Sequence, residues 1–589
     1  MRNGFVLALL VLIVASSFFI RVYRLGENPP ALFIDEASVG YNAYSILKTG
    51  RNEFGKFLPI FARAFGINFH NPVYLYSTVA SVKFFGLNEF AVRLPAAIFG
   101  AAAVLFTFLL AIELWKNARI ALIAAFLLAV SPWNFHLSRF AIEPTSLSCI
   151  LTAGIYFLIR SLRQTWCSFP AAVLLALSFY SYAPAFSFIP LFIIIFVILF
   201  RTTLKLNWKY YLTAALVLLI LVIPLAFPSV RGETQDEYLM EQLITHPRYH
   251  QFSVELLEES GFPWAWVKYI ERRPTLLAVA VFARNYFSCF SYRFLFAAGD
   301  TSTSRQHVSG FGVLHRAEAI FVIAGILICL LHGGVFNMLL LMWLLIFPIG
   351  PSLTAQWTPQ ITRLVCALPA FQLLGALGIS SVLSTLFQIK NGRSEMVDDR
   401  WETIDVKYKM IFFVSHLTSH ILHLTSYISH LTSNIFRLTS TIVISAFLIF
   451  LCFNIATYFS AFFKHYPSYA ANAWGYGIRE AIKDAEAVKD DYDLIIVDEK
   501  IPFVYIYVLF YLPFEPERLL KEEPLRFHGP YRIGTLGKYL IAQVRPCPEP
   551  MRCLYITHTP PPPFARPVRL YPYPGAVSEI ALSSNQKRK

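Results

Sequence analysis

Charged residues are scarce in this sequence, and their scarcity excludes most classes of soluble protein. Asp, Glu, Lys and Arg make up 15% of the 589 residues, whereas hydrophobic residues make up 56% and aromatic residues 16%. A soluble domain carries roughly 25% charged residues. The long apolar runs therefore need a membrane to bury them, and the composition indicates a protein with several spans.

Metal-binding and nucleic-acid-binding motifs are also absent. No HExxH or CxxC motif occurs, and the eight cysteines are scattered, mostly inside apolar runs. The formal net charge of +14 comes without a basic aromatic module, so we expect no nucleic-acid partner. The exceptions among the cysteines are Cys547 and Cys553 in CPEPMRC, which are close enough for a short disulfide in an oxidising compartment.

Eleven runs approach the length of about 20 apolar residues that a bilayer-spanning helix needs. They lie near residues 4–21, 94–112, 120–136, 142–159, 168–183, 185–200, 210–228, 317–334, 336–350, 364–387 and 441–462. The two runs between 168 and 200 are divided at Pro184, which breaks a helix, although one tilted helix with a re-entrant piece is the alternative. The first run lacks a small-x-small cleavage site, which favours an uncleaved helix over a signal peptide.

The basic residues of the short loops predict the orientation. With the N-terminus in the cytoplasm, the cytoplasmic loops between 113 and 209 hold seven Lys and Arg residues and one acid. The opposing short loops hold only Arg139 and Arg363, as expected when bases favour the cytoplasm. This topology for a cell-membrane protein places residues 22–93, residues 229–316 and the region from 463 outside.

Two adjacent carboxylates, Asp35 and Glu36, stand in the first outer loop within PALFIDEASVGYNAYSILKTG. Apolar residues at helical spacing from Val39 to Leu47 predict a short helix along the membrane surface. A carboxylate held between such a helix and the bundle is partly desolvated, which raises its basicity. The alternative interpretation is a solvated helix cap.

Several cations lie on the same predicted face as the acidic pair. They are Arg93 in RLPAAIFG, His136 and Arg139 in SPWNFHLSRFAIEP, and Arg363 in TPQITRLVCALP. The planar fork of arginine suits phosphate, and a lipid phosphate can reach such a site from within the membrane. The alternative is that each arginine simply extends to the lipid headgroups.

Six motifs in this order resemble one family, the polyprenyl-phosphate-sugar-dependent glycosyltransferases of the GT-C fold, which include protein O-mannosyltransferases and bacterial aminoarabinose transferases. The motifs are DEA, RLPAAIFG, SPWNFHLSRFAIEP, NYFSCFSYRFLFAAGD, ITRLVCALPAFQLLGALGI and FFKHYPSYAANAWGYGIREAI. The resemblance covers about residues 1–385 and the last motif. It implies an all-α polytopic membrane protein that transfers a sugar from a polyprenyl phosphate to a lipid, glycan or protein acceptor outside the cell, with inversion.

The resemblance also implies roles for individual residues. Asp35 would be the general base with Glu36 assisting, and Arg93, Arg139, Arg363 and His136 would be candidates for the donor phosphate. In the family, a GD step is followed by an adjacent Arg-His pair that closes over the site.

This sequence departs from that family pattern. Here Gln306 separates Arg305 from His307, with Asp300 before them, so contact with substrate and a purely structural loop remain equal alternatives. No motif fixes a metal site, and we assign no cofactor, although some members of the family need a divalent cation.

The domain organisation follows from the composition. A catalytic transmembrane domain is expected over 1–387, a cytoplasmic linker over 388–440, and the last span over 441–462. The linker repeats HLTS or RLTS every seven residues from His416, which favours a low-complexity insertion over a histidine metal site. For residues 463–589 we expect a small extracytoplasmic α/β domain, which includes the strand-like YDLIIVDE, and a flexible tail.

Three other functions compete with the glycosyltransferase. A transporter or flippase would place ionisable residues near the midplane of the spans, which here are almost free of charge. A glycan polymerase or ligase would share the large outer loop but not the early Asp-Glu pair. The C-terminal region could also be a binding module attached to a degenerate membrane part.

Overall fold

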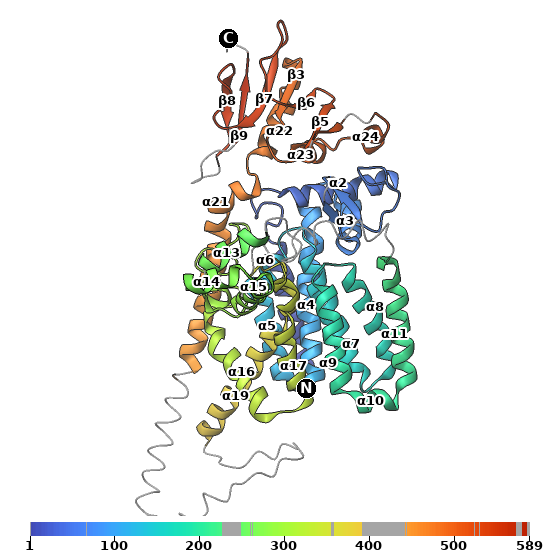
Figure 1. The fold of residues 1–589 in the computed structure, drawn as a ribbon, viewed down its shortest axis with the longest axis vertical. Helices are drawn as coiled ribbons and strands as arrows, with labels where there is room; N and C mark the ends of the chain where they lie inside the picture. The colour runs from blue at the N-terminus through green and yellow to red at the C-terminus, as the bar shows by residue number, and fades with distance from the viewer. Residues whose placement is uncertain are drawn as a thin grey trace, which may run out of the picture.

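The structure is a computed structural model in which a helical bundle carries a sheet-containing C-terminal domain at one end (Figure 1). It describes residues 2–65, 68–226, 249–259, 261, 263–354, 359–391, 442, 444–522, 525–528, 531–572 and 580–585. The linker with the HLTS repeats lies outside the described residues.

Each of the eleven apolar runs coincides with a helix of the bundle. The helices are α1 (Arg2–Val22), α4 (Glu89–Trp115), α5 (Ala118–Val130), α7 (Pro144–Ser161), α8 (Ser168–Phe179), α9 (Ala185–Leu199), α11 (Trp208–Val222), α16 (Ala319–His332), α17 (Val335–Ile346), α19 (Ala370–Asn391) and the helix over 444–470. Within the described ranges, six helices are long and apolar enough to cross a membrane, and three shorter apolar helices accompany them. The chain is therefore a multi-pass membrane protein, with fewer full-length spans by this measure than the eleven expected.

Small residues let the helices of the bundle approach closely. Helix α4 has a face of alanines and glycine, and a Cβ on Gly100 would overlap the Ser138 hydroxyl group. Such close approach replaces the hydrophobic driving force that membrane helices lack. The division at Pro184 is confirmed, because α9 begins directly after it and α8 ends at Phe179.

Above the bundle lies the segment that carries the acidic pair. Helix α2 (Ile34–Thr49) confirms the predicted short helix, and it packs on α3 (Pro72–Phe85), which follows the small hairpin of β1 (Ala62–Ala64) and β2 (Asn68–His70). Gly50 ends α2 in the left-handed region with φ 69°, a conformation that glycine adopts without strain. Most of α2 is buried by protein on several sides, so it does not lie freely on the membrane surface.

The described part of the predicted outer loop 229–316 is mostly helical. It contains α13 (Tyr249–Glu259), α14 (Trp264–Glu271), α15 (Pro274–Ser288) and a π-helical turn, η3 (Arg293–Ala297). The turn leads into an irregular segment, residues 298–315, which we call the capping loop. This loop returns to the bundle at η4 (Arg316–Glu318), just before α16.

The C-terminal domain is the α/β unit that the sequence predicted. Its seven-stranded sheet has the order β4-β5-β6-β3-β7-β9-β8, in which the central β3 runs parallel to β6 and β7 and the other pairs are antiparallel. The strands are β3 (Leu494–Asp498), β4 (Leu525–His528), β5 (Tyr531–Leu536), β6 (Tyr539–Ala542), β7 (Cys553–His558), β8 (Arg566–Leu570) and β9 (Ile580–Ser584). Strands β8 and β9 extend the sheet into residues 566–570 and 580–584.

Three α-helices in the described part of the chain accompany the sheet. They are α22 (Ile478–Ala487), α23 (Val504–Tyr511) and α24 (Pro516–Glu522). Helix α21 (Tyr466–Ala470) is instead the end of the membrane helix over 444–470. The apolar stretch IPFVYIYVLFYL forms α23, which is buried between the sheet and α2 rather than in a membrane.

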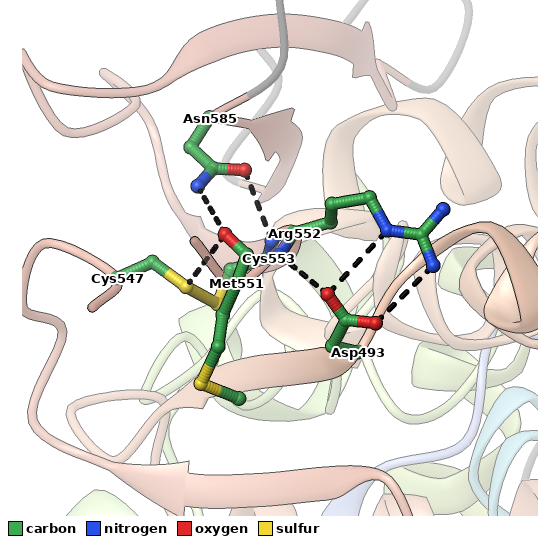
Figure 2. The surroundings of a disulfide bond; sticks show 6 residues. All are labelled: Asp493, Cys547, Met551, Arg552, Cys553 and Asn585. Carbon is green, nitrogen blue, oxygen red and sulfur yellow. Dashed lines mark hydrogen bonds and ion pairs between the residues drawn. A yellow bond between two sulfur atoms is a disulfide. The ribbon is translucent and has the colours of Figure 1, made fainter. Parts of the chain in front are cut away.

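Cys547 and Cys553 form a disulfide, with 6.1 Å between their Cα atoms (Figure 2). Two side chains hold the neighbouring backbone. Asp493 accepts hydrogen bonds from the Arg552 backbone and guanidinium, and Asn585 accepts from the Cys553 N–H and donates to the Met551 carbonyl. The bridge thus closes a turn at the start of β7.

Candidate active site

Glu36 is buried at the start of α2 and is fully engaged. Its carboxylate accepts two hydrogen bonds from Arg93, at 2.9 and 2.8 Å, and two more from the backbone N–H groups of Phe33 and Ala141. Only 1% of Glu36 is exposed. Because four hydrogen bonds engage the carboxylate within the protein, Glu36 fixes the architecture around the site and is not available to an acceptor.

Arg93 uses all of its side-chain N–H donors in hydrogen bonds within the protein. The three N–H groups that do not bind Glu36 donate to the backbone carbonyls of Leu25, Pro29 and Ala31, at 3.1, 2.9 and 2.5 Å. A guanidinium has five N–H donors, so none is left for a lipid phosphate. Arg93 folds the segment after α1 onto α4, and this geometry speaks against the phosphate-binding role expected for it.

Arg139 is likewise buried in backbone contacts. Its two terminal nitrogens donate to the carbonyls of Ile20, Arg21, Arg24 and Asn28, which surround the C-terminus of α1. A cation is favourable at the negative end of a helix. Arg139 therefore caps α1, and its position also speaks against a role at the donor phosphate.

Asp35 differs from its neighbour in having no hydrogen bond to any of the described residues. The charged groups that act on its carboxylate are His70, Arg305, Glu143 and Glu36. Burial raises the pKa of Asp35 to about 6, and the nearby His70 and Arg305 oppose that rise. A desolvated, more basic carboxylate was expected at this position, and its role as general base stays a prediction.

Arg305 is the cation that the fold brings to Asp35. Within the described ranges its guanidinium donates no hydrogen bond, and it lies 3.2 Å from the centroid of the Phe33 ring, two residues before Asp35. Burial lowers the pKa of Arg305, and the charge of Asp35 partly offsets that effect. An unbonded carboxylate and an unbonded guanidinium thus share one partly desolvated centre.

Two side chains hold the backbone of Arg305 in place. The Tyr466 hydroxyl donates to the Arg305 carbonyl at 2.7 Å, and His136 Nε2 lies 2.6 Å from the same oxygen. Trp474 in turn donates its ring N–H to the Tyr466 oxygen at 2.8 Å. His136, expected near the donor phosphate, is placed here to position the capping loop.

The other expected residues of the capping loop anchor it. The Asp300 carboxylate accepts from the Ser302 backbone at 3.0 Å and from the Ile361 N–H at 2.9 Å, and Asp300 is fully buried. His307 Nδ1 lies 2.9 Å from the Thr303 carbonyl, while the His307 carbonyl accepts from the Tyr469 hydroxyl. Asp300 and His307 therefore shape the loop, and of the three loop residues only Arg305 faces Asp35.

Arg363 follows the loop anchor by two residues in the chain. The Ile361 N–H donates to the Asp300 carboxylate, and the Ile361 carbonyl accepts a hydrogen bond from the Trp133 ring N–H at 2.8 Å. Arg363 is not among the main groups that shift the pKa of Asp35. Its role at the donor phosphate stays an expectation.

His70 and Glu143 complete the centre, and neither was among the catalytic or phosphate-binding residues expected from the sequence. His70 Nδ1 lies 3.7 Å from a Glu143 carboxylate oxygen, and its Nε2 lies 2.8 Å from the Ser38 hydroxyl. His70 stands on a three-residue strand that periodicity does not detect. Glu143 was visible as an outer-face acid, but only the fold brings it next to Asp35.

No metal is assigned to this centre. Within the part of the chain that the structure describes, no group of three or more His, Cys, Asp and Glu side chains is arranged to hold a metal ion.

Comparisons with known proteins agree with the membrane enzyme that the motifs resemble. Residues 69–227 match the family model described as dolichyl-phosphate-mannose-protein mannosyltransferase. This match covers less than half of the chain, and it confirms the resemblance to this class of glycosyltransferases over those residues. No curated protein matches the chain.

Solved structures of two membrane proteins are also similar to this chain. The crystal structure of ArnT from Cupriavidus metallidurans bound to undecaprenyl phosphate has 11% identity and a TM-score of 0.47, with 98% of each chain covered. Archaeal oligosaccharyltransferase AglB from Archaeoglobus fulgidus, in complex with an inhibitory peptide and a dolichol-phosphate, has 15% identity and a TM-score of 0.49. That comparison covers 87% of this chain and 64% of AglB. TM-scores below 0.5 do not by themselves establish a shared fold.

Proposed function

We propose that this chain is a membrane glycosyltransferase that moves a sugar from a polyprenyl phosphate to an acceptor hydroxyl at the extracytoplasmic face. The observation that carries the proposal is the juxtaposition of Asp35 and Arg305 at one end of a multi-pass helical bundle. Each is charged and partly desolvated, and neither has a hydrogen bond to a described residue. A reaction that needs one base and one cation uses both.

The chemistry follows from the donor. The acceptor oxygen attacks the anomeric carbon, the bond from that carbon to the phosphate oxygen breaks, and the electron pair leaves with the lipid phosphate. Asp35 takes the hydroxyl proton, and the Arg305 guanidinium binds the charge that develops on the departing phosphate. Attack from the side opposite the leaving group inverts the anomeric configuration.

Orientation is part of the proposal. The N-terminus and α10 (Arg201–Leu206) lie at the end of the bundle opposite α2 and the C-terminal sheet (Figure 1). The basic residues of the predicted cytoplasmic loops include Arg201 and Lys205 on α10. Since bases favour the cytoplasm, the Asp35 end and the C-terminal domain face outward.

The donor is a hexose or pentose linked to a polyprenyl phosphate, and the acceptor is a lipid, glycan or protein in contact with the membrane. The family match supports testing a mannosyl donor first. A pentosyl donor is the second to test, because nothing in the Asp35–Arg305 pair selects the ring substituents of the sugar.

The test is transfer of label from a panel of polyprenyl-phosphate sugars to membrane lipid and protein fractions. Purified wild type is compared with Asp35→Asn and with the control Asp490→Asn, whose side chain is 90% exposed on the C-terminal domain. We expect transfer by wild type and Asp490→Asn, and donor binding without transfer by Asp35→Asn. Equal transfer by all three proteins would show that Asp35 is not the base.

A transporter or flippase would give a different result in the same preparations. Reconstituted in vesicles, it would move the lipid-linked sugar between leaflets without forming a new glycosidic bond. Movement without transfer would replace the glycosyltransferase proposal. In the described helices, the charged groups gather at the ends of the bundle, which favours surface chemistry over a path through it.

A further inference from the structure

The C-terminal domain reaches into the candidate active site through one helix. Helix α23 lies directly over α2 (Figure 1), and residues 504–510 are all buried. A Cβ on Gly40 of α2 would lie 2.6 Å from a ring carbon of Phe510, so the two helices are in the closest contact that a glycine allows. The domain is therefore docked onto the element that carries Asp35.

Two further contacts fix this docking. The Tyr41 hydroxyl donates to the Phe514 carbonyl at 3.0 Å, which ties α2 to the end of α23. Arg479 on α22 binds Glu89, the first residue of α4, at 3.1 Å. The domain thus contacts α2, which carries the acidic pair, and α4, which carries Arg93.

Tyr507 is the residue of α23 that faces the centre. Its hydroxyl donates to the Leu32 carbonyl at 3.3 Å, and only 4% of the residue is exposed. Burial raises the pKa of Tyr507, and the charges of Asp35 and Arg305 also act on it. The hydroxyl therefore stays protonated, and it lies within electrostatic range of both reacting groups.

The segment that receives this hydrogen bond holds both halves of the centre. Phe33 directly follows Leu32, and Arg305 stacks on the Phe33 ring. Asp35 follows Phe33 by two residues. Phe33 is the N-cap of α2: its carbonyl accepts from the Ala37 N–H at 3.1 Å and its own N–H donates to Glu36, whereas the Leu32 carbonyl, one residue earlier, accepts from the Tyr507 hydroxyl. A hydrogen bond at Leu32 therefore restrains the backbone that leads to Asp35 and the Phe33 ring on which Arg305 stacks.

We propose that Tyr507 is a positioning residue of the glycosyl transfer reaction, through which the C-terminal domain completes the active site. The inference rests on the proposed function for its catalytic consequence, whereas its structural part stands on the contacts of Tyr507. It gives the domain a task in catalysis in addition to any binding of acceptor.

The experiment compares Tyr507→Phe with wild type and with Tyr511→Phe. Tyr511 lies one turn further along α23 with its ring parallel to that of Tyr507, but the charges that act on it are Glu89, Arg479 and Arg93. Both variants keep the ring and remove one hydroxyl. Hydrogen exchange of residues 30–40 reports on positioning, and kcat and donor KM report on the reaction.

We expect faster exchange at the start of α2 in Tyr507→Phe, roughly tenfold lower kcat, and a donor KM within about twofold of wild type. Tyr511→Phe should match wild type in all three measurements. A loss confined to kcat separates positioning from a general loss of fold, which would also speed exchange in β3.

Two kinds of result would contradict these proposals. Wild-type exchange and kcat in Tyr507→Phe, or a rise in exchange that includes β3, would overturn the inference. If wild type itself transfers no sugar from any donor, the proposed function fails, and exchange at residues 30–40 still decides whether Tyr507 holds the segment.

Discussion

At the scale of single residues, the acidic pair shows how position decides the role of chemically similar groups. Glu36 points to Arg93 and two backbone N–H groups, whereas the adjacent Asp35 points toward His70 and Arg305 without a hydrogen bond to a described residue. One carboxylate is engaged in structural hydrogen bonds, and burial raises the pKa of the other. Of these two neighbouring acids, Glu36 thus stabilises the structure and Asp35 is the proposed base.

The pH dependence of transfer should report the state of Asp35. Only the ionised carboxylate accepts a proton, and its pKa is raised to about 6. We expect kcat/KM to fall about tenfold per pH unit below 6 and to be level between about 7 and 8. The measurement is a pH profile of initial rates with saturating acceptor, and a profile with no acid limb near 6 would contradict the assignment.

The same pKa has a consequence for stability. A carboxyl with a raised pKa favours the folded state below its unfolded pKa and loses that contribution as pH rises toward 6. At pH 8 the ionised Asp35 therefore costs on the order of 3 kcal/mol. Asp35→Asn should raise the melting temperature at pH 8 and have little effect at pH 4, as thermal unfolding in detergent would measure.

Arg305 should be as important for transfer as Asp35. Arg305→Ala removes the cation at the departing phosphate, and such electrostatic contacts typically contribute about 10²–10³ to the rate. The matched control is Arg293→Ala, an exposed arginine just before the same loop. Rate measurements with the best donor would show loss only for Arg305→Ala, and unchanged kcat/KM in that variant would remove Arg305 from the mechanism.

The arginines also mark a limit of prediction from sequence. Arg93 and Arg139 were expected at the phosphate because their side chains suit it, yet the same fork suits backbone carbonyls at a helix end. Periodicity cannot tell a carbonyl cage from a lipid phosphate. Asp35 was predictable because it stands beside a second acid in the outer loop after the first span, whereas Arg305 becomes its partner only when a loop about 270 residues further on folds back.

At the scale of elements, helix α2 depends on the small size of one residue. A Cβ on Gly40 would lie 2.6 Å from Phe510 and 2.8 Å from Val92, and both neighbours are buried. Because neither can move far, Gly40→Ala must separate α2 from α23 or α4. The junction of the two domains is therefore sensitive to a single methyl group.

We expect Gly40→Ala to destabilise the protein by about 1–3 kcal/mol and to lower transfer. The control is Gly26→Ala, whose Cβ would meet its nearest neighbour at an ordinary 3.6 Å. Thermal unfolding and transfer rates of both variants test this. If Gly40→Ala behaved like Gly26→Ala, the close contact between α2 and α23 would not exist in solution.

At the scale of the whole molecule, the sequence predicted the type of each region better than it predicted where the individual elements lie. All eleven apolar runs became helices, because a run of that composition has no other way to satisfy its backbone in a membrane. The α/β domain was predicted from strand-like LIIVD, but β8, which is exposed along its length, was not, because an exposed edge strand lacks an apolar pattern. The contact between the two domains had no sequence signal, since it consists of apolar packing, hydrogen bonds from tyrosine hydroxyls to main-chain carbonyls and the Arg479–Glu89 ion pair, none of which forms a motif.

The disulfide offers a test of the proposed orientation of the whole chain. Cys547 and Cys553 are bonded in the C-terminal domain, and disulfides persist in oxidising compartments outside the cytoplasm. In intact cells, a membrane-impermeant maleimide should label these cysteines only after treatment with an impermeant reductant. The Cys547→Ser/Cys553→Ser double variant serves as the control, and it should lose the label that reduction exposes. Labelling that requires permeabilised cells would place the domain, and with it the Asp35 end of the bundle, in the cytoplasm.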